Sequence, residues 1–111
     1  MSKNDPLNLT LTEESILNAI LFRERYGLEI MKAIAEASKG KKTIGFSSLY
    51  PNLRKLEKKG FVTSRWGDET PEENTGARRR YYQITGSGMA AVNRKQEYLT
   101  ALQRLTLAGE L

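Results

Sequence analysis

The 111-residue sequence contains no cysteine and no histidine. Without cysteine, disulfides, thiolate catalysis and cysteine-bound metals are excluded. Without histidine, the side chain that most often serves as a general base or a transition-metal ligand is missing as well. We therefore predict that the chain is not an enzyme and that it uses no cofactor or metal.

Long apolar runs are also missing. No stretch approaches the roughly 20 apolar residues that a membrane-spanning helix needs, and the first residues lack a basic segment followed by an apolar one. A length of 111 residues suits one small domain with a single core. These features predict a cytoplasmic protein that has no membrane partner.

Positive charge is present in excess, and it is concentrated in two places. The chain has 18 Lys+Arg against 13 Asp+Glu, a net charge of +5. Residues 39–60 contain a run of lysines and one arginine with Glu57 as their single acid, and Arg78, Arg79 and Arg80 follow an acidic stretch. Two basic clusters in so small a chain favour a polyanionic partner, because phosphate contacts release counterions. The alternative for the first cluster is a solvated helix face.

Two helices are predicted in the first 40 residues. Residues 1–9 are polar and contain a proline, which is typical of a flexible arm. Thr10 and Glu13 form a capping-box pattern before apolar residues at helical spacing. After Gly27 the apolar spacing resumes through Ile34, and we expect this second helix to end near residues 38–40.

A third helix is predicted around Leu49, Leu53 and Leu56, which fall at i, i+4 and i+7 and so share one inward face. Pro51 lies inside this pattern, although proline costs about 3 kcal/mol or more in a helix interior. A helix capped by Ser47 or Ser48 would place the proline in the first turn, where its missing N–H costs little. The serines would then lie at the positive end of the helix dipole, which suits contact with a phosphate or a base edge.

A hairpin and a last helix complete the predicted order. Residues 61–66 and 78–84 have strand composition, and the turn formers between them indicate a long charged loop. Trp66, Tyr81 and Tyr82 on these strands are expected in the core rather than stacked on a ligand. Thr85 is a suitable N-cap for a helix of about 20 residues whose apolar stripe exceeds what its own core needs, which favours a second copy as partner.

The order helix, helix, helix, strand, strand, helix is that of a winged helix-turn-helix domain, in which the third helix enters the major groove and the hairpin is the wing. We thus predict an α+β, mostly helical fold. The predicted division is a flexible arm (1–9), a winged-helix DNA-binding domain (10–85) and a C-terminal dimerisation helix (86–111).

Three segments resemble the PadR family of transcriptional regulators. They are "RYGLEIMKAI" (25–34), "SSLYPNLRKLEKKGFV" (47–62) and "GARRRYYQIT" (76–85). The resemblance implies a winged-helix repressor that dimerises through its C-terminal helix, often together with the first helix. Many members have a proline in the basic run of the wing, where this chain has Ala77 followed by three arginines. The single C-terminal helix is similar to the shorter PadR branch, and "WGDETPEE" (66–73) is similar to the circadian-clock-associated Pex proteins, which implies repression of a clock gene.

The predicted partners are double-stranded DNA and a second copy of the chain, acting on the nucleoid. Ser47, Ser48 and Asn52 are expected to read base edges, and Tyr50, Lys55 and Lys58 to contact the backbone. The DNA-binding set also includes Lys41, Lys42, Arg78, Arg79 and Arg80. The dimerisation set is Met89, Val92, Leu99, Leu102 and Leu105. Two alternatives stay open: a winged-helix module that binds other proteins, and a regulator that senses a small-molecule effector.

Overall fold

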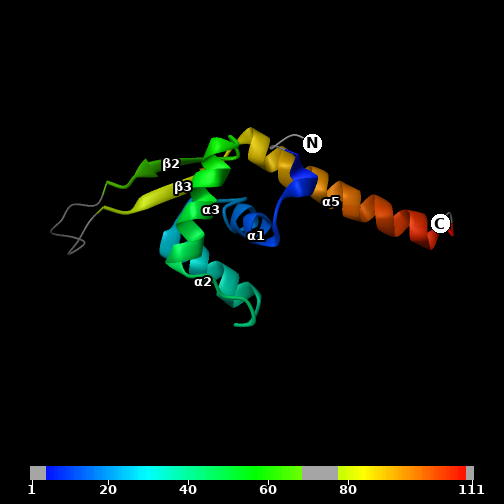
Figure 1. The fold of residues 1–111 in the computed structure, drawn as a ribbon, viewed down its shortest axis with the longest axis horizontal. Helices are drawn as coiled ribbons and strands as arrows, with labels where there is room; N and C mark the ends of the chain where they lie inside the picture. Colours follow the sequence, from blue (N-terminus) through cyan, green and yellow to red (C-terminus); the bar gives the residue numbers. More distant parts are fainter. Residues whose placement is uncertain (1–4, 69–77, 110–111) are drawn as a thin grey trace.

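The computed structural model describes residues 5–68 and 78–109. Figure 1 shows a helical body from which a hairpin projects on one side and a long helix on the other. The elements are η1 (Pro6–Asn8), α1 (Leu11–Ala19), β1 (Arg25–Tyr26), α2 (Gly27–Ala37), α3 (Phe46–Lys58), β2 (Val62–Trp66), β3 (Arg80–Ile84) and α5 (Gly86–Leu107). The predicted α+β, mostly helical class is confirmed.

Helix α1 begins with the predicted capping box. The Thr10 hydroxyl accepts from the Glu13 N–H at 3.1 Å, and the Thr10 N–H donates to the Glu13 carboxylate at 2.9 Å. These two hydrogen bonds give partners to the backbone N–H groups of Thr10 and Glu13, which the start of a helix otherwise leaves unpaired. Behind the cap, Ile16, Leu17 and Ile20 are fully buried.

The core lies between α1, α2, α3 and the base of the sheet. Leu49, Leu53 and Leu56 of α3 are almost completely buried, which confirms the predicted inward stripe. The remaining core residues come from every major element: Leu9, Ile16, Leu17, Ile20, Ile30, Ile34, Phe61, Val62, Tyr82 and Ala91. Burial of so many apolar side chains is the main stabilising term for a domain of this size.

The start of α3 differs from the sequence-based prediction. Gly45 is the N-cap, so Ser47 and Ser48 are the second and third helical residues rather than the cap. Pro51 is therefore the sixth residue of the helix and lies beyond the first turn. It cannot donate to the Ser47 carbonyl, and it is tolerated because both residues lie on the exposed side of α3.

The sheet has three antiparallel strands in the order β1-β3-β2. The two-residue strand β1 was not predicted, because two residues carry no periodicity; it pairs Arg25 with Tyr82 and Tyr26 with Tyr81. In the hairpin, Trp66 pairs with Arg80 and Val62 with Ile84. We define the wing as β2, β3 and the segment between them. The acidic tip predicted for this segment falls on residues 69–77, which lie outside the described residues.

The aromatic prediction is right for one residue and wrong for another. Tyr82 is 4% exposed and belongs to the core, and this burial raises the pKa of its phenol. Trp66 is 54% exposed, because its position near the outer end of β2 carries it past the helices that cover the sheet base.

Helix α5 starts at the predicted cap, where the Thr85 hydroxyl accepts from the Gly88 N–H at 3.0 Å. Gly88 packs so closely on the Phe61 carbonyl that a Cβ there would collide with it. Lys95 pairs with Glu14 of α1 at 2.7 Å. Beyond this ion pair, residues 96–99 and 101–109 are all exposed, and the helix extends away from the body (Figure 1).

Part of the segment predicted as a flexible arm, residues 1–9, is folded against the body. Residues 6–8 form the short helix η1, which packs against α5, and Leu9 is buried in the core. Residues 1–4 lie outside the described part of the chain.

Candidate nucleic-acid interface

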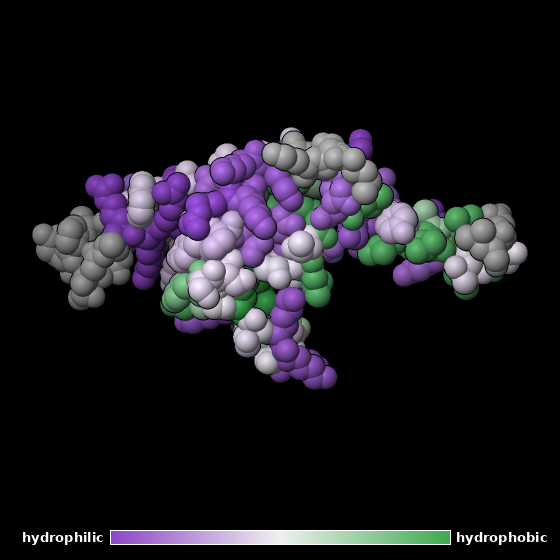
Figure 2. All heavy atoms as spheres, in the orientation of Figure 1, coloured by the Kyte–Doolittle hydropathy of each residue, from purple (hydrophilic) through white to green (hydrophobic). Residues whose placement is uncertain are grey.

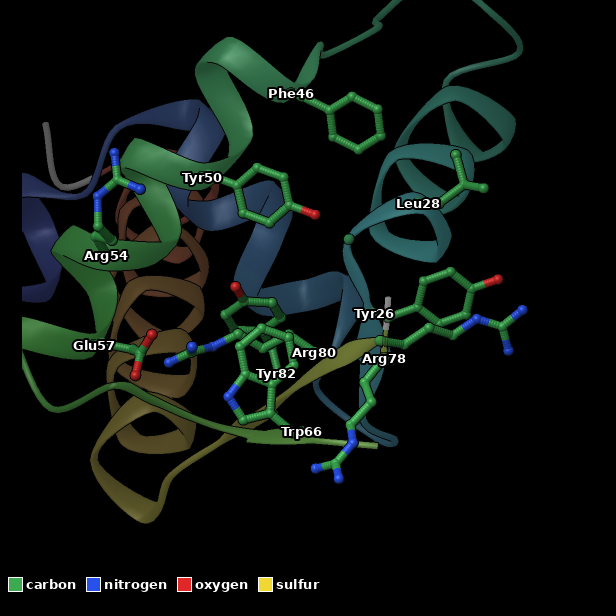
Figure 3. A pocket seen from close by; sticks show the side chains of 12 residues that line it. Tyr26, Leu28, Phe46, Tyr50, Arg54, Glu57, Trp66, Arg78, Arg80 and Tyr82 are labelled. Atoms are coloured by element: carbon green, nitrogen blue, oxygen red, sulfur yellow. The ribbon is translucent and has the colours of Figure 1, made fainter. Parts of the chain in front are cut away.

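A groove of about 450 Å³ separates α3 from the wing (Figure 3). We call it the α3–wing groove. One wall is the side of α3, the other is formed by both wing strands, and the junction of β1 with α2 closes one end. Its lining residues are Tyr26, Gly27, Leu28, Phe46, Tyr50, Arg54, Glu57, Trp66, Arg78, Arg79, Arg80 and Tyr82.

The α3 wall consists of residues spaced one helical turn apart. Phe46, Tyr50 and Arg54 follow at i, i+4 and i+8, and Glu57 completes the row. The rings of Phe46 and Tyr50 are stacked, with centroids 5.7 Å apart and an interplanar angle of 11°. The Tyr50 hydroxyl lies against Gly27, where any side chain would collide with it. The absence of a Cβ at Gly27 thus gives Tyr50 its position.

The wing wall carries three arginines with different surroundings. The Arg80 guanidinium lies over the ring of its cross-strand neighbour Trp66, 5.2 Å from the centroid. Arg79 lies over Tyr26, with a distance of 4.6 Å. Figure 3 shows the Arg80 side chain extending toward Glu57 on the α3 wall. Stacking on aromatic faces holds guanidinium groups in place while leaving their N–H groups at the edge.

The wing is attached to the body by a second set of contacts. Arg65 of β2 forms an ion pair with Glu24, which precedes β1, and its guanidinium also lies 4.9 Å from the ring centroid of Tyr81. Tyr81 meets Tyr26 edge to face, with centroids 5.7 Å apart. Hydrogen bonding from Arg65 lowers the pKa of the Glu24 carboxyl. These contacts fix the wing relative to α2 and so fix the width of the groove.

Charge in the groove is strongly positive. Among its described lining residues are four arginines, at positions 54, 78, 79 and 80, and one carboxylate, Glu57. The exposed aromatic Phe46 and Trp66 lie beside them. A concave surface with this balance attracts a polyanion and offers flat faces on which rings can stack.

The sequence-predicted α3 residues fall into two groups. Ser47, Lys55 and Lys58 are exposed on the side of α3 opposite the buried leucines, next to the groove wall. Ser48 and Asn52 lie on the flank away from the groove, and the Asn52 amide donates to the Ser48 carbonyl at 2.8 Å. This hydrogen bond is exposed to solvent, and the role of Asn52 in reading base edges stays a prediction.

The two predicted lysines of the connector lie apart from the groove. Lys41 is exposed, and Lys42 is partly buried. The backbone N–H of Lys42 donates to the Ser38 hydroxyl at 2.9 Å, and its carbonyl accepts from the same hydroxyl at 3.0 Å. These bonds fold the connector back on the end of α2. Both lysines precede the N-terminal end of α3, which is the end toward which its backbone N–H groups point.

Arg54, Phe46 and Glu57 were not among the predicted site residues. The signal for them was present, because Tyr50 was predicted and residues at i−4, i+4 and i+7 of a helix share its face. What the sequence did not indicate is which side of α3 the wing covers.

The fold and the site together define a winged-helix protein with a basic groove beside its third helix. Residues 16–94 match the model of the transcriptional regulator PadR-like family, and the chain belongs to this family. The predictions of the family and of a regulator rather than an enzyme are confirmed. Within residues 5–68 and 78–109, no helix has the length and apolar composition needed to span a bilayer.

Comparison with individual proteins agrees with this. An uncharacterized protein X of Lysinibacillus sphaericus is 36% identical over 75 residues, which are 68% of this chain and 65%, just under two thirds, of that protein. A transcriptional regulator from Clostridium thermocellum is 29% identical, with a TM-score of 0.69 over 86% of this chain and 89% of the other. Bacillus subtilis PadR in complex with operator DNA is 24% identical, with a TM-score of 0.67 over 78% of this chain and 46% of the other, and shares the fold.

Proposed function

We propose that the protein is a homodimeric, sequence-specific DNA-binding repressor of transcription. The observation that carries this proposal is the α3–wing groove, a concave surface lined by Arg54 of α3 and by the wing arginines. A helix beside a basic hairpin is the arrangement that places one element in the major groove and the other against the adjoining backbone. Membership in a family of transcriptional regulators supports the same function.

In this mechanism the two sides of the site have different tasks. Ser47 and Arg54 on α3 contact base edges, since a serine hydroxyl and an arginine fork match the hydrogen-bonding groups in the major groove. Ser48 contacts base edges through its hydroxyl, and Asn52 does so when its amide leaves the backbone carbonyl of Ser48. Tyr50, Lys55 and Lys58 position α3 on the sugar-phosphate backbone, helped by Lys41 and Lys42. The wing arginines bind phosphates or the adjacent groove.

The dimer is supported by the second half of α5. In the first half, Gly88, Ala91 and Val92 face the body, and Lys95 pairs with it. The same face continues beyond the body through Leu99, Leu102 and Leu105, each more than a third exposed. Figure 2 shows apolar residues gathered on this projecting part of the helix. A second copy would cover them and would hold two α3 helices on one duplex. Met89 is exposed near the start of α5 and is proposed for the edge of this contact.

Residues 10–85 would then be the DNA-binding domain and residues 86–111 the dimerisation segment. Repression follows from occupying a promoter on the nucleoid in the cytoplasm. A narrower proposal, repression of a circadian clock gene by a Pex-type regulator, is supported by the sequence similarity of "WGDETPEE" alone. Expressing the protein together with a reporter gene driven by the clock-gene promoter tests this narrower proposal. Unchanged expression of the reporter would contradict it.

The DNA-binding proposal is tested by titrating a fluorescent duplex with the protein at several salt concentrations. We expect a steep loss of affinity with salt, and the slope should become shallower by about one counterion in Arg78→Ala and in Arg79→Ala, because the wing arginines are assigned to phosphates. Lys32→Ala is the matched control, because Lys32 is exposed on α2 and does not line the α3–wing groove. Slopes that respond to Lys32 as strongly as to the arginines would contradict a specific role of the groove.

A further inference from the structure

Glu57 is the one carboxylate among the described residues that line the α3–wing groove. It lies on the α3 wall, partly buried, facing β2 and β3. A negative charge at this place opposes the approach of DNA phosphates, because both groups have the same sign. The contacts of Glu57 indicate which role of this side chain offsets its unfavourable effect on DNA binding.

A chain of hydrogen bonds runs from Glu57 through the wing. The Ser64 hydroxyl of β2 donates to Glu57 Oε2 at 3.1 Å, and the same hydroxyl oxygen accepts from Arg80 Nε at 3.0 Å. A serine hydroxyl has one proton to donate, and here the carboxylate takes it, so its oxygen is left to accept from the guanidinium. The direction of both bonds is thus set by the charges at the two ends, which strengthens each of them.

These contacts fix the Arg80 side chain before any ligand arrives. Ser64 holds the Nε edge, and Trp66 supports the flat face of the guanidinium. Figure 3 shows the side chain extended along the groove toward Glu57. The hydrogen bond to Ser64 uses Nε and leaves the N–H groups of Nη1 and Nη2 at the edge of the stacked guanidinium. This terminal fork has the geometry that binds guanine O6 and N7, or two phosphate oxygens, in a bidentate manner. Arginine held in this way loses little side-chain entropy on binding.

We infer that Glu57 and Ser64 are positioning residues for Arg80, and that Arg80 is the wing residue that determines sequence specificity. The inference rests on the DNA-binding function proposed above. In this arrangement the carboxylate contributes twice: it orients Ser64, and it disfavours binding that depends on phosphates alone. Discrimination between sequences is gained at the expense of non-specific affinity.

The test compares affinity for a duplex selected by the wild-type protein with affinity for a scrambled duplex of equal length. We expect Arg80→Ala and Ser64→Ala each to lower the ratio of the two affinities about tenfold. The double variant, with both substitutions, should have the same ratio as Arg80→Ala alone. Arg80→Lys keeps the charge but lacks the Nε donor, so it should also lower the ratio. Glu57→Gln keeps an acceptor for Ser64 and removes the charge, so binding of the scrambled duplex should tighten about two- to threefold.

Thr63→Ala is the matched control, because Thr63 is the exposed neighbour of Ser64 and points to the other face of the hairpin. Thermal unfolding of each variant shows that the fold is kept. If wild type binds both duplexes equally, the proposed function itself fails. If wild type discriminates but Ser64→Ala keeps the full ratio, or lowers it equally in the Arg80→Ala background, the positioning role is overturned.

Discussion

Glu13 and Lys59 form an ion pair of 2.8 Å that joins the first turn of α1 to the C-cap of α3. The Glu13 side chain is 3% exposed and that of Lys59 is 19% exposed. The same carboxylate accepts the Thr10 N–H, so one acidic side chain both caps α1 and fixes the end of the helix that we assign to DNA. Breaking such a pair is costly because it leaves a buried charge uncompensated.

Stability should fall at acidic pH partly through Glu13. Burial alone opposes ionisation of this carboxyl, but hydrogen bonds from Lys59 and the Thr10 backbone outweigh it and lower the pKa below its usual value of 4.5. The unfolded chain therefore takes up the proton first, and the contribution of Glu13 is full above about pH 4.5 and is lost as pH falls through the lowered pKa. Urea unfolding of wild type and Glu13→Gln from pH 7 to pH 3 should show a free-energy difference that shrinks below about pH 4.5. A constant difference would contradict this role.

Gly27→Ala should disturb the groove. A Cβ at this position would collide with the Tyr50 hydroxyl and lie 3.1 Å from the ring carbon Cζ, so Tyr50 must leave its place beside Phe46. We expect a loss of about 1 kcal/mol in the free energy of unfolding and weaker DNA binding. Tyr50→Phe in the same chain removes the atom that the new Cβ meets most closely, so it should recover part of the lost stability.

Gly86→Ala is the control for this substitution, since Gly86 is also the first residue of its helix and a Cβ there would meet nothing within 4 Å. It should be neutral or stabilising, because alanine favours helix. Equal losses in the two variants would show that the Tyr50 contact is not the cause.

Pro51→Ala should stabilise the protein. Pro51 lies beyond the first turn of α3 and removes the hydrogen bond to the Ser47 carbonyl, so alanine should raise the free energy of unfolding by about 1–3 kcal/mol. Thermal and urea unfolding measure this gain. Lys55→Ala, one turn further on the exposed side, should change stability by less than about 0.5 kcal/mol. No gain at Pro51 would mean that α3 is adapted to the proline.

Leu102→Glu should convert the proposed dimer into a monomer. It places a charge on the exposed apolar face of the projecting part of α5, so the melting temperature of the monomeric domain should stay within a few degrees. Sedimentation velocity measures the mass. Thr100→Glu on the opposite face should remain dimeric. A wild-type chain that sediments as a monomer at micromolar concentration would contradict the dimer.

The sequence predicted most of the fold because helical periodicity and capping chemistry are local. The Thr10 cap, the buried leucines of α3 and the Thr85 cap follow from residues close together in the chain. The Gly45 cap did not follow, since serines at 47 and 48 are better caps in isolation, whereas the helix begins at Phe46, whose ring stacks on Tyr50. Arg54 and Trp66 line the groove because α3 lies beside the wing. No local sequence pattern predicts this tertiary arrangement.

The most direct test of the central claim is selection of bound duplexes from a random pool with the purified protein. The account predicts an enriched palindromic sequence whose half-sites are about 10 base pairs apart, centre to centre, because two α3 helices would enter successive major grooves. The same selection with Arg54→Ala should lose bases within each half-site while keeping the spacing. A pool that stays random after repeated rounds would contradict the claim that the α3–wing groove reads DNA.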